Sequence, residues 1–153
     1  MAQRRSESCR STARCDWSRY RSPRHGALSA QVSGRAPELS CVQEESSLRR
    51  PVGGVTVWRR QLENLLRLGE SPFVDIQVMP TSRWVHPGTG GRIQVLKFAD
   101  GTAIGRADDE FVGRPTAQPE QLRILKLRFG IIRARALTPE ESLAFVKQVR
   151  RET

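Results

Sequence analysis

The stretch PEQLRILKLRFGIIRARALTPEESL, residues 119–143, holds two helix signatures in succession. In the first, apolar residues recur at steps of three and four, the spacing of one face of an α-helix. These residues are Leu122, Leu125, Phe129, Ile132 and Ala136. Proline at position 119 suits the first turn of a helix, because the amide hydrogen it lacks would have no partner there. We therefore predict a long helix that begins at residue 119 and turns this stripe into the core.

The same helix carries more apolar residues than one buried stripe requires, namely Ile124, Leu127 and Ile131. A solvated surface helix has one apolar face only, so we predict that this helix is either central in the domain or packed against a partner. We take these three residues as a candidate interaction surface. Gly130 costs about 1 kcal/mol relative to alanine within a helix, and predicts close packing or a kink at that point.

The second signature is the capping box Thr138-Pro-Glu-Glu141. The threonine hydroxyl can accept from the amide of Glu141, whose carboxylate reaches back to the start of the helix. It predicts a last helix whose inward residues are Leu143, Val146 and Val149. Glu140 and Glu141 are better explained as cap and dipole residues than as catalytic acids, since no nucleophile or metal ligand accompanies them.

Upstream, the pattern predicts a short strand at 39–43, a helical turn at 44–50 and a helix at 55–68 with Gly69 as its C-terminal cap. Residues 73–79 alternate, which predicts a half-buried strand with Val74, Ile76 and Val78 on one face. The glycine-rich loop at 81–91 precedes a strand rather than a helix, so it is no phosphate-binding loop.

Two further strands, at 92–98 and 102–106, flank Asp100-Gly101, a dipeptide typical of tight hairpins. We expect them to pair antiparallel. Taken together, the elements predict an α+β fold in which a small antiparallel sheet packs with amphipathic helices.

Residues 1–37 differ from the rest in composition. They hold eight arginines against Glu7 and Asp16, which gives +6 of the total net charge of +10. Beyond the initiator methionine their only large apolar side chains are Trp17, Tyr20, Leu28 and Val32. So little apolar surface does not offset the entropy of ordering the chain. We expect a disordered Arg/Ser-rich tail at 1–37 and one folded domain at 38–153.

The tail allows several interpretations. Basic residues interleaved with aromatic ones can bind nucleic acid without sequence preference, through phosphates and base stacking. The candidate contacts are Arg4, Arg5, Arg10, Arg14, Trp17, Arg19, Tyr20, Arg21 and Arg24. The tail is also compatible with inert polypeptide from a misplaced start or a shifted reading frame, and its composition resembles an organellar transit peptide.

Catalytic and metal-binding chemistry has little support in this sequence. The sequence shows neither a disulfide framework nor the ligand spacing of a zinc site. Its cysteines are Cys9, Cys15 and Cys41, and its histidines are His25 and His86. The acidic run 108–110 (Asp108, Asp109, Glu110) lacks the spaced oxygens of a calcium loop, so we interpret it as a solvated turn. We expect no enzyme activity, no cofactor and no metal. No apolar run approaches the ~18 residues of a membrane span, and we expect a cytoplasmic protein.

Four segments, in this order, carry a resemblance to a known family: ESSLRRPVGG (45–54), RQLENLL (60–66), VDIQVMP (74–80) and RARALTPEESL (133–143). The chain resembles the C-terminal domain of unknown function of bacterial lambda-repressor-type (Xre-like) helix-turn-helix regulators, which are described as antitoxin-like. The resemblance implies transcriptional regulation or a toxin–antitoxin-like pair, often with a small partner protein.

In that family a helix-turn-helix and the first part of this domain precede the position of Glu45. In this chain the tail occupies that place, and it holds no run of ~20 residues with helical periodicity. We therefore expect an N-terminally truncated effector or interaction domain without specific DNA binding. A protein partner or self-association is expected, and a small ligand is compatible with this interpretation. The alternative function is non-specific nucleic-acid binding through the tail.

Overall fold

The computed structural model describes residues 38–153, and the expectations for 1–37 lie outside them. The α+β class is confirmed. The elements are β1 (Leu39–Glu44), α2 (Glu45–Arg49), α3 (Val55–Gly69), β2 (Val74–Met79), η1 (Thr81–Arg83), β3 (Ile93–Lys97), β4 (Ala103–Ala107), η2 (Phe111–Gly113), α4 (Pro119–Arg135) and α5 (Pro139–Glu152). No helix of the described part is long and apolar enough to cross a bilayer.

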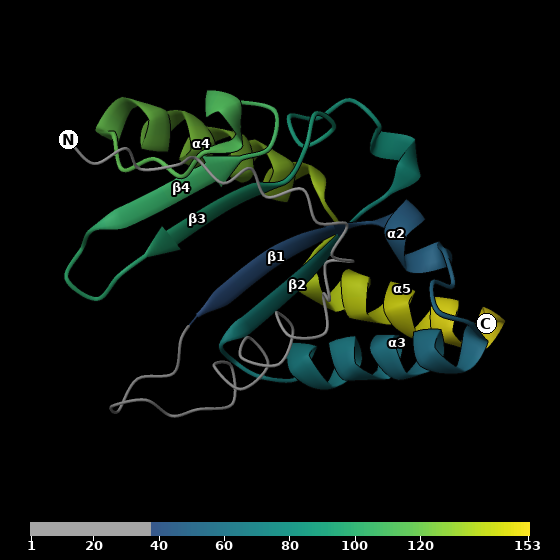
Figure 1. The fold of residues 1–153 in the computed structure, drawn as a ribbon. Helices are drawn as coiled ribbons and strands as arrows, with labels where there is room; N and C mark the ends of the chain where they lie inside the picture. The colour runs from purple at the N-terminus through teal and green to yellow at the C-terminus, as the bar shows by residue number, and fades with distance from the viewer. Residues whose placement is uncertain (1–37) are drawn as a thin grey trace, which may run out of the picture. The chain divides into compact units, whose positions relative to one another are not determined.

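Strands β1 and β2 form a parallel pair, with Leu39 opposite Val74 and Glu44 opposite Met79. Helices α2 and α3 connect the two strands and return the chain to the same end of the sheet, as a parallel pair requires. Figure 1 shows α2 beside the end of β1 and α3 below the sheet. The sequence predicted an antiparallel sheet only, so this pairing is an addition to the predicted architecture.

Strands β3 and β4 form the predicted antiparallel hairpin, with Ile93 opposite Ala107 and Lys97 opposite Ala103. Its turn follows the local chemistry of the sequence. Gly101 has a φ of 87°, a conformation that side chains with a Cβ rarely adopt. The Asp100 carboxylate accepts from the amide of Thr102 at 2.9 Å and from its hydroxyl at 2.7 Å. The hairpin prediction is confirmed.

Strand β2 is buried on both faces, so the prediction of a half-buried strand is wrong. Val78 packs in a core with Leu62 of α3 and Val146 of α5. Met79, which points the other way, packs with Ile132 of α4. Helices thus cover both faces of β2: α3 and α5 lie on one side and α4 on the other (Figure 1).

Two glycines have roles other than those predicted. Gly69 is the last residue of α3 and is followed by Glu70 in a helical conformation, so it is not a left-handed cap. A Cβ at Gly69 would lie 2.5 Å from Leu143 Cδ2, which shows that α3 and α5 approach closely there. Gly130 has no heavy atom within 4 Å of its Cβ position among the described residues. The prediction of close packing at Gly130 is wrong, and α4 continues through it.

Helix α4 turns most of the predicted stripe inward, since Leu122, Leu125, Ile132 and Ala136 are buried. Phe129 is only half-buried, so Leu125 is the central residue of the stripe. Beneath it lies Gly105 of β4, where a Cβ would meet Leu125 Cδ1 at 2.5 Å. The missing side chain lets the hairpin lie directly against α4.

Helix α5 begins with the predicted capping box. The hydroxyl of Thr138 accepts from the amide of Glu141 at 3.2 Å, and the Glu141 carboxylate accepts from the amide of Thr138 at 2.8 Å. Val146 and Val149 are buried as predicted, and Leu143 is half-buried against the same core. The capping prediction is confirmed.

Candidate functional site

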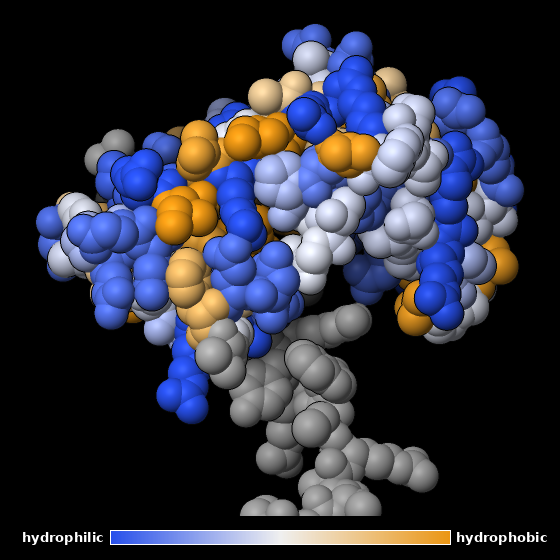
Figure 2. All heavy atoms as spheres, turned by 90° about the horizontal axis from the view of Figure 1, so that it is seen from above, coloured by the Kyte–Doolittle hydropathy of each residue, from blue (hydrophilic) through white to orange (hydrophobic). Residues whose placement is uncertain are grey.

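The outer face of α4 carries the three residues predicted as an interaction surface, Ile124, Leu127 and Ile131, which we call the outer stripe. Their exposed fractions are 36%, 60% and 37%. They lie on the side of α4 away from Leu125 and Ile132, because they fall between the buried positions in the helical repeat. Figure 2, which views the molecule from the side of α4, shows apolar side chains gathered among hydrophilic ones.

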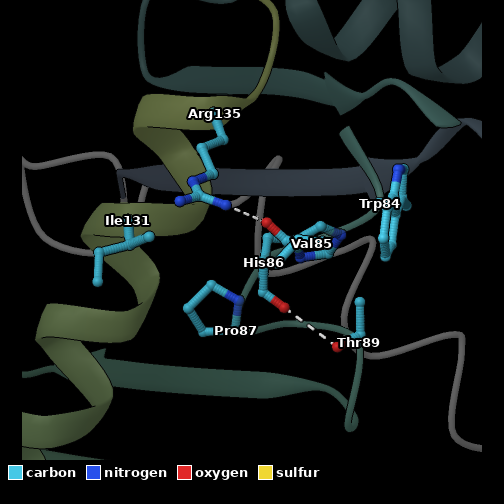
Figure 3. A pocket seen from close by; sticks show the side chains of 7 residues that line it. All are labelled: Trp84, Val85, His86, Pro87, Thr89, Ile131 and Arg135. Carbon is cyan, nitrogen blue, oxygen red and sulfur yellow. Dashed lines mark hydrogen bonds between the residues drawn. The ribbon is translucent and has the colours of Figure 1, made fainter. Parts of the chain in front are cut away.

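An open hollow of about 590 Å³ adjoins the C-terminal end of this helix. It is lined by Trp84, Val85, His86, Pro87, Thr89, Ile131 and Arg135 (Figure 3). We call it the Trp84 hollow. The indole of Trp84 is 75% exposed and Val85 is 59% exposed. Ile131 belongs both to the outer stripe and to this hollow, so the two features form one continuous surface.

The loop that forms the hollow is fastened at its base by His86, which is buried. Nε2 of His86 lies 3.1 Å from a carboxylate oxygen of Glu44, and Nδ1 accepts from the amide of Gly88 at 3.2 Å. Its carbonyl accepts from the hydroxyl of Thr89 at 3.1 Å. With both ring nitrogens engaged, His86 holds the loop in place and is not positioned as a general base.

Helix α4 fastens the other side of the loop. The guanidinium of Arg135 donates to the carbonyl of Val85, the contact drawn in Figure 3. Arg83 in turn donates to the carbonyl of Arg135, at the end of the helix. In the described part of the chain, the carbonyl groups of Val85 and Arg135 have no partner within their own loop and helix end, and these two hydrogen bonds supply one. They also fix Trp84 and Val85 at the edge of the hollow.

The acidic run 108–110 is the predicted solvated turn, with Asp108 and Asp109 exposed, and its carboxylates also form ion pairs. Asp108 lies 3.3 Å from Arg106, and Asp109 lies 3.5 Å from Arg128 of α4. Glu110 also pairs with Arg128. Since each acid faces an arginine, the turn ties the end of β4 to α4. Within 38–153 no group of three or more metal-ligating side chains comes together.

Cys41, on β1, is the one cysteine in the described part of the chain. Burial raises the pKa of its thiol, and the nearby carboxylate of Asp75 raises it further. A raised pKa keeps the sulfur protonated, and the protonated thiol is a weak nucleophile. Cys41 is therefore best understood as a packing residue of β1.

A second, polar hollow lies between α3 and α5 and is lined by charges of both signs. Arg150 there lies 3.7 Å from Glu63 across the two helices. This mixture is typical of a solvated surface. The candidate nucleic-acid contacts in 1–37 lie outside the described residues, as do Cys9, Cys15 and His25.

The sequence indicated the outer stripe but not the Trp84 hollow. Trp84 and His86 stood in a glycine- and proline-rich loop, and nothing in the spacing places that loop beside α4. One local feature pointed to a binding site: Trp84 lies in a loop without apolar periodicity. Aromatic side chains are enriched in interfaces, so a tryptophan in such a loop indicates a candidate contact surface.

The chain matches a protein family described as Domain of unknown function (DUF5753) over residues 10–148. The match thus includes most of the basic N-terminal stretch as well as the described domain. No curated protein and no solved structure matches the chain. Because the family match covers most of its length, this chain belongs to the DUF5753 family.

Proposed function

We propose that this chain is the effector and protein-interaction domain of an antitoxin-like transcriptional regulator. The observation that carries the proposal is the outer stripe. Leu127 is 60% exposed on a helix whose opposite face already supplies the core. The domain does not need this residue for its own packing, and a contiguous exposed apolar patch marks an interaction site.

Two further features support a binding role. The outer stripe continues into the Trp84 hollow, whose volume of about 590 Å³ lies in the range of sites that receive a side chain or a small ligand. The regulatory part of the proposal is supported by the four segments that resemble the C-terminal domain of Xre-like regulators, such as VDIQVMP at 74–80.

The competing function is non-specific nucleic-acid binding through residues 1–37, which hold +6 of the net charge of +10. The two functions place activity in different parts of the chain. Phosphate contacts by arginines would give binding that weakens steeply with salt and shows little sequence preference.

A two-hybrid screen of the source genome with the full chain tests the proposal. Partners recovered by the wild type should be lost with Leu127→Glu. They should be retained by a tail variant with glutamine at Arg4, Arg5, Arg10, Arg14, Arg19, Arg21 and Arg24. The matched control is Leu96→Glu, because Leu96 is also exposed, at 56%, and lies on β3.

The opposite pattern would contradict the proposal. If Leu127→Glu retains every partner while the tail variant loses binding to random duplex DNA, function lies in the tail. In that case the described domain would serve another purpose than partner binding by α4.

A further inference from the structure

The outer stripe has the spacing of a helix-pairing face. Ile124, Leu127 and Ile131 are followed by Ala134, also exposed, so the steps are three, four and three. This repeat corresponds to positions a and d of a heptad, with isoleucine at both a positions and leucine at the first d position. A second helix can lie along such a face with its apolar residues in register.

The charged residues at the flanking positions of α4 itself are all basic. Positions e and g of the heptad are Arg123, Arg128, Gly130 and Arg135. Arg128 is already paired with Asp109 and Glu110. Arg123 forms no ion pair with any residue in 38–153, and Arg135 donates only to the carbonyl of Val85, so both keep an uncompensated positive charge. No acidic side chain occupies a flanking position.

This charge pattern selects the kind of partner. When two helices pair, residues at e and g of one lie near those of the other, and opposite charges there set partner choice. A second copy of this chain would place Arg123 against another arginine. A helix with glutamate or aspartate at the flanking positions would instead neutralise the charges of Arg123 and Arg135.

The Trp84 hollow extends the same surface at the C-terminal end of the stripe. Ile131 and Arg135 line it, and its lining holds no acidic side chain. Figure 3 shows the side chain of Arg135 reaching from α4 toward the loop that carries Trp84, with Ile131 on the same helix. Exposed tryptophan beside arginine is a composition common among residues that dominate binding energy.

We propose that the outer stripe binds an amphipathic helix of a different protein, with apolar residues at heptad spacing and acidic residues flanking them. An apolar side chain at the end of that helix enters the Trp84 hollow. The inference rests on the proposed interaction function and specifies its partner: an acid-flanked helix, rather than a second copy of this chain.

The test uses the full chain and two synthetic peptides of about three heptads, labelled for fluorescence anisotropy. Both have isoleucine and leucine at a and d, and one has glutamate and the other lysine at e and g. The glutamate peptide should bind at least ~10-fold more tightly than the lysine peptide, and its binding should weaken as salt rises. Leu127→Glu should reduce its affinity ~10-fold or more, whereas Leu96→Glu should leave it unchanged.

A charge-reversal variant separates recognition from folding. Arg123→Glu should weaken binding of the glutamate peptide and strengthen binding of the lysine peptide, a change of preference that misfolding does not produce. The inference is overturned if the two peptides bind equally, if the glutamate peptide fails to bind at about 0.1 mM, or if Leu96→Glu is as damaging as Leu127→Glu.

Sedimentation of the full chain alone gives a separate check. A monomer is expected, and a dimer that Leu127→Glu dissociates would replace the acidic helix with a second copy. The peptide test can fail while Leu127→Glu still abolishes binding of two-hybrid partners. That result would overturn the inference of an acid-flanked helical partner, but it would not contradict the proposed function. If Leu127→Glu also retains every two-hybrid partner, both the inferred partner and the proposed function are overturned.

Discussion

Leu125→Ala is expected to lower the free energy of unfolding of the full chain by about 2–5 kcal/mol, the usual cost of truncating a fully buried leucine. Leu125 has no exposed surface, and its Cδ1 lies over Gly105 of β4, so the cavity would open between α4 and the hairpin. A loss of this size is a large part of the roughly 5–15 kcal/mol typical of a domain.

Leu127→Ala is the matched control, since it makes the same change two residues along the same helix. Leu127 is 60% exposed, so its truncation should change the free energy of unfolding by less than about 0.5 kcal/mol. Urea denaturation of both variants measures the difference. Equal losses would mean that the outer stripe is part of the core, and would contradict the division of α4 into a buried and an exposed apolar face.

Ser142→Ala should cost about 1–3 kcal/mol, although it removes a single oxygen atom. Ser142 is fully buried at the start of α5, and its hydroxyl accepts from the amide of Val78 at 2.9 Å. The same hydroxyl donates to the carbonyl of Thr138 at 2.7 Å. Alanine leaves the Val78 amide without a partner at the point where α5 packs on β2.

Ser47→Ala is the control for this second prediction. Ser47 also donates to a backbone carbonyl, that of Glu44, but in an exposed position where water can replace it. Its loss should stay within about 0.5 kcal/mol. Chemical denaturation measures the free energy of unfolding of the two variants. If Ser142→Ala is as stable as Ser47→Ala, the hydrogen bond between Ser142 and the Val78 amide does not contribute to stability.

Local signals in the sequence predicted the elements well. The steps of three and four from Leu122 to Ala136 predicted α4, and Asp100-Gly101 predicted the hairpin. Thr138 and Glu141 predicted the start of α5, because a capping box is complete within four residues. Each of these features depends on neighbours in sequence alone.

Long-range contacts were not predictable in the same way. Gln77 lies on the face of β2 that a half-buried strand would turn to water, yet it is buried. Its side-chain amide donates to the carbonyl of Leu137 at 2.8 Å, a partner 60 residues away. The parallel pairing of β1 with β2 likewise depends on how α2 and α3 return the chain. No local pattern reports either contact.

The same distinction between local patterns and long-range contacts applies to the candidate site. The outer stripe could be predicted because Ile124, Leu127 and Ile131 exceed what one buried helix face requires. The Trp84 hollow could not, because Trp84 and Ile131 come from segments far apart in the sequence. They meet through the contacts of Arg135 with Val85 and of His86 with Glu44.

Site-specific photo-crosslinking in cells of the source organism identifies what binds the outer stripe. A benzophenone amino acid replaces Leu127 in the full chain, and in a separate variant it replaces Leu96. We expect a light-dependent product at position 127 but not at 96, in which the crosslinked segment of another protein is an acid-flanked amphipathic helix. Crosslinking at position 96 alone, or at 127 only to a second copy of this chain, would show that the outer stripe does not bind such a helix.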